Sequence, residues 1–159
     1  MTIQRCGWCS DDPLYIAYHD LEWGQAVFTE AHLFEMLCLE GQQAGLSWIT
    51  VLKKREAYRQ HFFQYSITEI AALSDDDIAL KLQDAGLIRH RGKLQAIRDN
   101  ARAWQKLKDT DINVVTWLWD FVAQQPIRND VPDYRIAPAQ TDASVAMSKA
   151  LKKNGFKFI

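Results

Sequence analysis

The sequence predicts an all-α protein, and three observations support that prediction. Apolar residues recur at helical spacing along most of the chain, as at Leu33, Met36 and Leu37. Residues typical of helix caps precede these stretches, and glycines follow several of them. No segment shows the apolar and polar alternation of a half-buried strand. The chain has 159 residues, so we expect a single domain over residues 1–159.

Residues 1–28 show no clear period, and we expect them to form a loop-rich arm packed on the helical body. Cys6 and Cys9 have the C-x-x-C spacing, and His19 follows ten residues after Cys9. These are three possible zinc ligands, whereas a closed structural site takes four. The alternative is a pair of free buried thiols and an ordinary histidine.

The first two helices of the body are expected on either side of a glycine. Thr29 can cap a helix that runs to about Ala44, and Gly45 suits its C-terminal stop. Ser47 can cap the following helix, whose apolar positions continue to Phe62. We therefore expect two consecutive helices joined by a tight turn.

A carboxylate continues the apolar stripe of the first of these helices. Glu40 follows Leu37 by three residues, where another apolar residue is expected. Burying an unpaired carboxylate is costly, so it would protonate or find hydrogen-bond donors. The alternative is that Glu40 lies at the edge of the stripe and reaches water. Gln42, Gln43 and Trp48 add amide groups and a flat ring nearby, a combination that suits a planar ligand such as a nucleobase.

The second half of the chain continues as helices. Their expected starts are a capping box at Ser66, a cap at Ser74 with three acidic residues after it, Gly92, Asp111, and Thr141 or Asp142. Gly86 is expected to end the helix that Ser74 starts, and Gly155 to end the last one. Residues 125–140 contain three prolines and are predicted to be a loop.

Residues 75–107 are predicted to form two helices around a tight basic loop. Gly86 and Gly92 would let the backbone approach another molecule closely, and the second helix begins with free N–H groups. The positive side chains in this loop are Arg89, His90, Arg91 and Lys93. We expect this hairpin to bind DNA phosphate, and the alternative is a solvated basic turn.

Composition limits the function classes. The net charge of −1 argues against a tight non-specific nucleic-acid binder, so any such binding must use local patches. Three cysteines without disulfide-like spacing indicate a reducing compartment. With no signal-peptide pattern and no run long enough to span a membrane, we expect a cytoplasmic protein. The apolar run 156–159 suggests either a chain cut short or a segment packed on the body.

Several longer motifs resemble one family along nearly the whole chain. They are Cys6-Gly7-Trp8, the stretch from Asp12 to Asp20, Glu22-Trp23-Gly24, residues 40–54, residues 84–93 and residues 148–158. In these the sequence resembles the bacterial 3-methyladenine DNA glycosylases of type I, within the helix–hairpin–helix superfamily. The resemblance implies a helical bundle of that glycosylase type and a base-excision repair enzyme that hydrolyses the N-glycosidic bond of 3-methyladenine in double-stranded alkylated DNA.

The resemblance also implies roles for single residues. Tyr18 and Glu40 match residues that hydrogen-bond the excised base, and Trp48 matches the ring that stacks on it. Trp8, Tyr15 and Trp23 match the aromatic lining of the pocket, and Gly86, Arg89, Arg91, Gly92 and Lys93 lie in the hairpin that holds the DNA backbone. Leu46, between two helices, is a candidate wedge into the minor groove, but it could equally be a hydrophobic-staple partner of Val51.

Zinc enters through the resemblance as well. Cys6 and His19 match half of a structural zinc site, and Cys9 is not part of the family's site. The other half, a His and a Cys, is expected in a C-terminal segment that this sequence does not contain. We therefore expect an incomplete site, with zinc absent or sub-stoichiometric.

The expected reaction needs no strong acid, because a nucleotide methylated at N3 of adenine is cationic and its glycosidic bond is weak. No residue must act as a Schiff-base lysine, so we expect a monofunctional, monomeric glycosylase. One alternative is a non-catalytic DNA-binding helix–hairpin–helix module. A metal-dependent phosphohydrolase built on His19 and Asp20 is disfavoured, because the other histidines show no ligand-like spacing.

Overall fold

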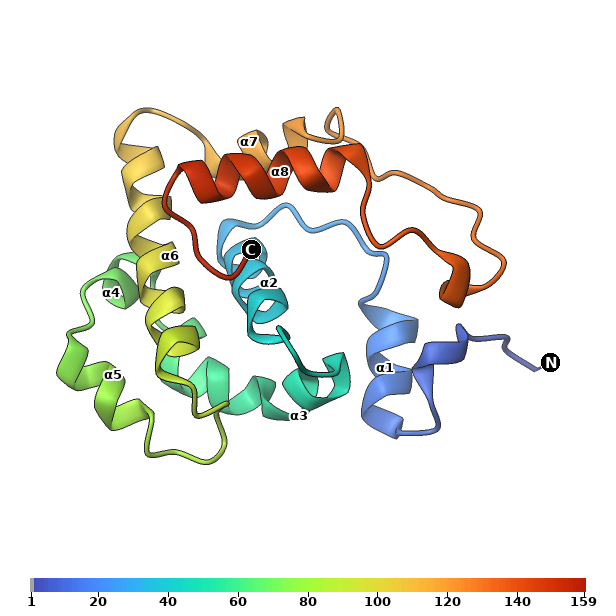
Figure 1. Cartoon of the computed structure of the whole chain (residues 1–159), viewed down its shortest axis with the longest axis horizontal. Coiled ribbons are helices and arrows are strands. Elements are labelled where there is room, and N and C mark those ends of the chain that lie inside the picture. Colours follow the sequence, from blue (N-terminus) through green and yellow to red (C-terminus); the bar gives the residue numbers. More distant parts are fainter. Residues whose placement is uncertain (1) are drawn as a thin grey trace.

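A computed structural model describes residues 2–159 and confirms the all-α prediction (Figure 1). Its α-helices are α1 (Pro13–Leu21), α2 (Glu30–Gln42), α3 (Trp48–Tyr58), α4 (Ile67–Ala71), α5 (Asp75–Lys81), α6 (Arg91–Asp109), α7 (Val114–Asp120) and α8 (Asp142–Lys153). Short 3-10 turns at Gly7–Cys9 and Tyr134–Ile136 and a π-helical turn at Arg59–Phe63 complete the list. Over this described range there is no strand, and none of the helices has the length and apolar character needed to cross a membrane.

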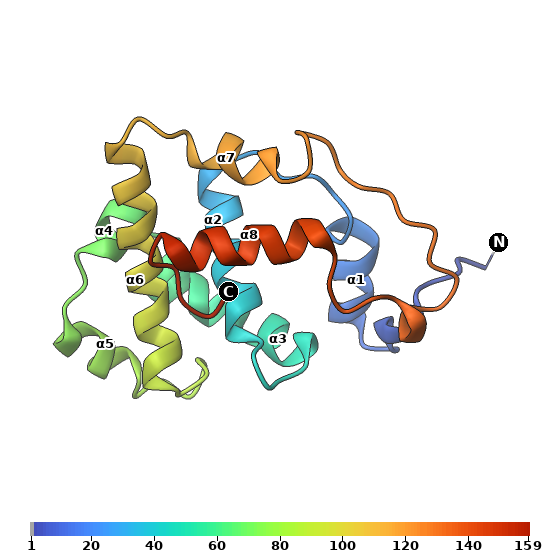
Figure 2. The same cartoon turned by 45° about the horizontal axis from the view of Figure 1, so that its top comes forward.

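The longest helix, α6, is the centre of the body. It packs against α2, α4, α5 and α7, and Leu94, Ile97 and Trp104 on its inner face are fully buried. The indole nitrogen of Trp104 donates to Glu30 Oε1 over 3.0 Å, which satisfies the polar atom of this large core side chain. In both views α8 runs across the body and the chain then turns back to end beside α2 (Figures 1 and 2).

Several helix starts agree with the predicted caps. Ser66, Ser74 and Thr141 each accept a hydrogen bond from the backbone N–H three residues later, in complete capping boxes. Thr29 and Ser47 occupy the predicted N-cap positions, but their side chains make no capping hydrogen bond. These starts are encoded within four residues, which is why the sequence predicts them.

Two predicted boundaries are wrong. Asn113 caps α7, accepting from Thr116 N–H over 3.1 Å, whereas Asp111 has a left-handed φ of 61° in the preceding turn. Helix α5 ends at Lys81, before Gly86, and two further turns lead into the hairpin. Acidic and amide side chains serve turns and caps alike, so the sequence alone did not separate these roles.

The N-terminal arm is only partly a loop, because residues 13–21 form α1. Asp12 accepts from Leu14 N–H over 2.9 Å, and Pro13 is the first helical residue. Proline suits that position because its missing N–H would have no helical partner there. The Asp-Pro pair that suggested a turn is therefore a helix start.

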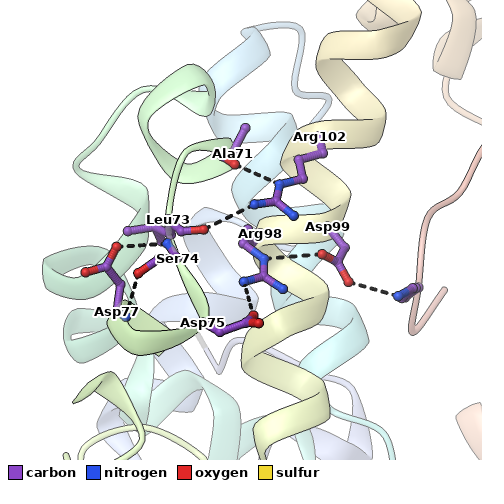
Figure 3. Close-up of polar contacts among 9 residues, drawn as sticks. Ala71, Leu73, Ser74, Asp75, Asp77, Arg98, Asp99 and Arg102 are labelled. Atoms are coloured by element: carbon purple, nitrogen blue, oxygen red, sulfur yellow. Dashed lines mark hydrogen bonds and ion pairs between the residues drawn. The ribbon is translucent and has the colours of Figure 1, made fainter. Parts of the chain in front are cut away.

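Two arginines on one side of α6 fix the start of α5 (Figure 3). Arg98 Nη1 donates to Asp75 Oδ1 over 2.6 Å, and Arg98 Nε donates to Asp99 Oδ1 over 3.3 Å. One turn later, Arg102 donates to the carbonyls of Ala71 and Leu73 over 2.8 and 3.2 Å. One ion pair therefore joins α6 to the first residue of α5, and two hydrogen bonds from Arg102 hold the end of α4 and the link that leads into α5.

The apolar run 156–159 packs on the body, as one of the two interpretations expected. Phe156 is 3% exposed, and the Lys157 backbone N–H donates to Asn100 Oδ1 over 2.8 Å. Any Cβ added at Gly41 would collide with the Phe158 carbonyl oxygen. The run therefore lies directly against the last turns of α2, next to Glu40.

Candidate functional site

Five aromatic side chains predicted for the site lie together in the structure. The Trp8 ring centroid is 5.2 Å from that of Tyr15, 5.3 Å from that of Trp23 and 6.4 Å from that of Tyr18. Tyr18 in turn lies 5.6 Å from Trp48. The cluster joins the arm to the start of α3, with Tyr18 and Trp48 buried and Trp23 about half exposed.

Trp48 contains an unsatisfied polar atom. Its Nε1 is buried without a hydrogen-bond partner. Every other buried side-chain nitrogen or oxygen in residues 2–159 has a partner. Leaving a buried donor unpaired costs about 1–3 kcal/mol, so an acceptor from a ligand or water would be favourable there. The cluster thus offers ring faces and one free donor.

Glu40 lies near the end of α2 and reaches solvent, which agrees with the edge position left open by the sequence. Its side chain forms no hydrogen bond or ion pair with another residue in the described part of the chain. Surrounding protein nevertheless desolvates the carboxylate enough to raise its pKa. Burial, and then the negative charge of Glu40, raise the pKa of Tyr18 to about 12. The phenol is therefore protonated at neutral pH and can donate a hydrogen bond.

Glu40 and the aromatic cluster border different hollows. Glu40 lines one of about 440 Å³, together with Gly41, residues 43–46 and the tail residues Phe158 and Ile159. Tyr18 and Trp23 line a second, of about 500 Å³, that extends to α2 and Trp119. Trp8 and Trp23 line a third, of about 1050 Å³, beneath the loop 126–137. The structure brings the predicted residues into one region without enclosing them in a single cavity.

The arm is attached to α3 by an ion pair that sequence reasoning missed. Arg55 donates through both terminal nitrogens to the two carboxylate oxygens of Glu22, over 2.8 and 2.9 Å. A weaker pair joins Lys53 Nζ to Asp12 Oδ2 over 3.4 Å. Tyr18 lies in α1 and Trp48 is the first residue of α3, so these contacts join the two elements that carry the facing rings. The residues are too far apart in sequence for any local signal to reveal the pairs.

The hairpin presents part of the predicted basic surface. Arg89 and Arg91 are exposed, as the phosphate-binding prediction requires. His90 caps α6 instead, since its Nδ1 accepts from Lys93 N–H over 3.1 Å. Gly86 is needed for space, because a Cβ there would lie 3.0 Å from both Ala57 Cβ and Asp84 Oδ1. Gly92 is the second residue of α6 and is partly buried.

Lys93 is not placed as the prediction required. It is 5% exposed, and its Nζ donates to the carbonyl oxygens of Gln42 and Ala44 over 2.9 and 2.7 Å. The prediction of Lys93 as a phosphate contact is therefore wrong, because its ammonium is enclosed by the end of α2. By contrast, Leu46 is 40% exposed at the tip of the turn, which agrees with an exposed tip better than with a staple.

The candidate zinc ligands do not form a closed site. The Cys6 backbone N–H lies 3.3 Å from His19 Nε2, and His19 Nδ1 lies 2.9 Å from Asp20 Oδ1, so both ring nitrogens have partners. Cys9 is buried at 1% exposure. No three possible ligands come together in residues 2–159. The residues present therefore do not fit the four-ligand structural site of the resemblance.

Comparisons with known proteins agree with this arrangement. The family model described as methyladenine glycosylase matches residues 8–159. DNA-3-methyladenine glycosylase 1 of Escherichia coli (strain K12) is 54% identical over 157 residues, which cover 99% of this chain and 84% of the relative.

Solved structures give the same result. A crystal structure of 3-methyladenine DNA glycosylase I has a TM-score of 0.95 at 54% identity, covering 98% of this chain and 86% of that one. The Staphylococcus aureus enzyme, solved for its recognition of 3-methyladenine, has a TM-score of 0.91 at 34% identity, covering 97% of this chain and 82% of that one. The chain therefore belongs to the methyladenine glycosylase family.

Proposed function

We propose that this chain removes 3-methyladenine from alkylated double-stranded DNA by hydrolysing the N-glycosidic bond. The observation that carries the proposal is the aromatic cluster of Tyr18 and Trp48 near the unpartnered carboxylate of Glu40. It occurs in a chain that is 54% identical to a DNA-3-methyladenine glycosylase over nearly its whole length. An enzyme of this kind must rotate the damaged nucleotide out of the duplex before it can act on the base.

The residues of the cluster suit a cationic, planar base. Electron-rich faces such as that of Trp48 attract a cation by roughly 0.5–2 kcal/mol per contact, which favours the methylated base over neutral adenine. The Glu40 carboxylate would accept a hydrogen bond from the amino group of the base. The protonated phenol of Tyr18 would donate one to a ring nitrogen. Because methylation already weakens the glycosidic bond, these residues have to select and orient the base and admit water to the sugar.

The chemistry proposed is monofunctional, without cleavage of the DNA strand. Strand-cleaving glycosylases need a free amine that attacks the sugar carbon. Lys93 is the buried lysine nearest the turn that follows Glu40, and burial lowers its pKa. Its ammonium is nevertheless engaged with two backbone carbonyls, so it does not serve as a nucleophile.

We propose that DNA binds across the hairpin and the turn after α2. Arg89 and Arg91 would neutralise phosphates without reading sequence. Leu46, exposed at the tip of the turn, would enter the minor groove and occupy space left by the rotated nucleotide. The enzyme would act as a monomer, since one chain carries all of these groups.

The test is release of the base from methylated duplex DNA, followed by chromatography of the free bases. We expect 3-methyladenine in solution and strands that break only after later alkali treatment of the abasic sites. Tyr18→Phe should slow release while leaving the helical content unchanged. DNA binding without any released base would instead support a non-catalytic helix–hairpin–helix module.

A further inference from the structure

A buried polar network connects the hairpin to the turn after α2. Gln42, Tyr58 and Lys93 are 1%, 0% and 5% exposed. Gln42 Nε2 donates to the Lys93 carbonyl over 2.9 Å, while Lys93 Nζ donates to the carbonyls of Gln42 and Ala44 over 2.9 and 2.7 Å. Tyr58 OH donates to Gln42 Oε1 over 2.8 Å. The side-chain amide of Gln42 thus has a partner on each side.

A second lysine, Lys54, connects α3 to the beginning of the hairpin. Lys54 Nζ, from α3, donates to the carbonyl of Ala85 over 2.9 Å and lies 3.5 Å from that of Leu87. The Ile88 backbone N–H approaches Tyr58 OH at 3.4 Å. The hairpin is therefore bonded to α3 at its beginning and to the end of α2 at Lys93.

The charge of Lys93 is located at the end of a helix and not beside a carboxylate. It forms no ion pair in the described structure, and its two acceptors are carbonyls at the C-terminal end of α2. Those carbonyls lack helical partners, and the helix dipole makes this end negative. Desolvating an ammonium is costly, whereas an apolar side chain would avoid that cost. What Lys93 adds, and an apolar residue would not, is a defined direction for the chain leaving α2.

From this geometry we propose that Lys93 is a positioning residue for Leu46. By holding the carbonyls of Gln42 and Ala44, it fixes the turn 43–47 relative to the phosphate-binding arginines of the hairpin. The inference rests on the proposed function. In a duplex, the inserted side chain and the bound phosphates must match a fixed spacing, and a displacement of about 1 Å can reduce a rate by roughly a hundredfold.

The experiment compares Lys93→Met with Lys106→Met. Methionine keeps most of the length of the lysine and removes its charge and donors. Lys106 is exposed near the far end of the same helix and makes no side-chain hydrogen bond in the described structure, so it controls for loss of one positive charge. We expect Lys93→Met to lower the single-turnover excision rate from duplex DNA by roughly ten- to hundredfold, while Lys106→Met leaves it unchanged.

Two further measurements separate positioning from other roles. Because Lys93 touches no phosphate, the slope of log DNA affinity against log salt should be the same in Lys93→Met and wild type. Affinity for free 3-methyladenine should stay within about twofold, because the free base needs no hairpin. Combining Lys93→Met with Leu46→Ala should cost less than the sum of the two effects, since both act through the same turn.

Three results would overturn the proposal: an unchanged excision rate, a salt slope lowered by about 1 as for a lost phosphate contact, or equal loss of free-base binding and excision. If Lys93→Met does not fold, Tyr58→Phe decides the question, because it removes the hydroxyl that donates to Gln42, at the cost of one long contact with the Ile88 N–H. That variant should show the same pattern with a smaller rate loss, and a wild-type rate would refute the inference. Failure of the wild-type protein to release base would reject the proposed function instead.

Discussion

Replacing Glu40 by glutamine should weaken function and strengthen the fold at the same time. The substitution keeps the shape of the side chain and removes its charge. Glu40 makes no side-chain hydrogen bond or ion pair in the described residues, so no protein contact is lost. The weaker binding therefore comes from a changed contact with the ligand, and the greater stability comes from removing a desolvated charge.

The loss of affinity follows from the change in hydrogen-bond type. Hydrogen bonds to charged groups contribute about 1.5–3 kcal/mol and neutral ones about 0.5–1.5 kcal/mol, a difference of about 1 kcal/mol. Free 3-methyladenine should thus bind about fivefold more weakly, as measured by titration calorimetry. Excision from DNA should fall further, by roughly ten- to hundredfold, because the base is cationic in the nucleotide and also loses the attraction of the carboxylate.

The gain in stability depends on pH, and its sign follows from the raised pKa of Glu40. The folded protein holds the proton more tightly than the unfolded chain, so ionisation of Glu40 destabilises the fold. This penalty is absent below the ordinary carboxyl value of 4.5 and complete once the pH exceeds the folded-state pKa. Glu40→Gln should therefore raise the urea midpoint at pH 7, and the difference from wild type should vanish below about pH 4.5.

The reasoning is refuted by either of two outcomes. Wild-type affinity and excision in Glu40→Gln would remove the carboxylate from the site. A lower urea midpoint at pH 7 would mean that the carboxylate has a stabilising partner. Glu69→Gln offers a contrasting control, because that carboxylate accepts from the Ser66 backbone N–H at the start of α4. Glutamine can still accept this bond, but the charge that favours a helix N-terminus is lost, so the fold should become slightly less stable.

Three other changes have definite expected outcomes. Gly41→Ala places a methyl group against the Phe158 carbonyl, and chemical denaturation should show a loss of about 1–3 kcal/mol. Arg91→Ala should reduce the slope of log DNA affinity against log salt by about 0.9, and a wild-type slope would mean that the hairpin is only a solvated turn. Arg55→Met leaves Glu22 without its partner, so thermal unfolding should show a loss of about 1 kcal/mol in stability. The affinity for the free base should fall as well. Unchanged affinity would show that this ion pair does not orient the rings.

Local signals account for what the sequence predicted well. The sequence predicts a capping box at Ser66 and helix starts at Ser74 and at Thr141 or Asp142, and the structure has complete capping boxes at Ser66, Ser74 and Thr141. The aromatic residues of the site followed from a family resemblance covering nearly the whole chain, and the structure places them in one cluster. In the arm the local signal was ambiguous, because an Asp-Pro pair is found at the start of turns as well as of helices.

Long-range contacts account for what the sequence could not predict. Lys93 lies in a basic run of the kind that is usually solvated, and only the end of α2, 51 residues earlier, encloses its ammonium. Glu22 and Arg55 are 33 residues apart, and neither has a neighbour that announces the pair. Glu40 shares a hollow with Phe158 and Ile159, which are more than 100 residues later in the chain. Each of these outcomes depends on contacts between residues far apart in the sequence, which local sequence patterns do not reveal.

The division of the aromatic cluster between the arm and α3 has a thermodynamic consequence. A base can use Tyr18 and Trp48 together only while α1 is docked, so the observed dissociation constant is the intrinsic one divided by the docked fraction. An arm docked in half of the molecules would double it. Conversely, a bound base must slow amide hydrogen exchange in α1, since each ligand that needs the docked arm also stabilises it. If the base binds as proposed, the Arg55–Glu22 pair would raise affinity by increasing the docked fraction of the arm.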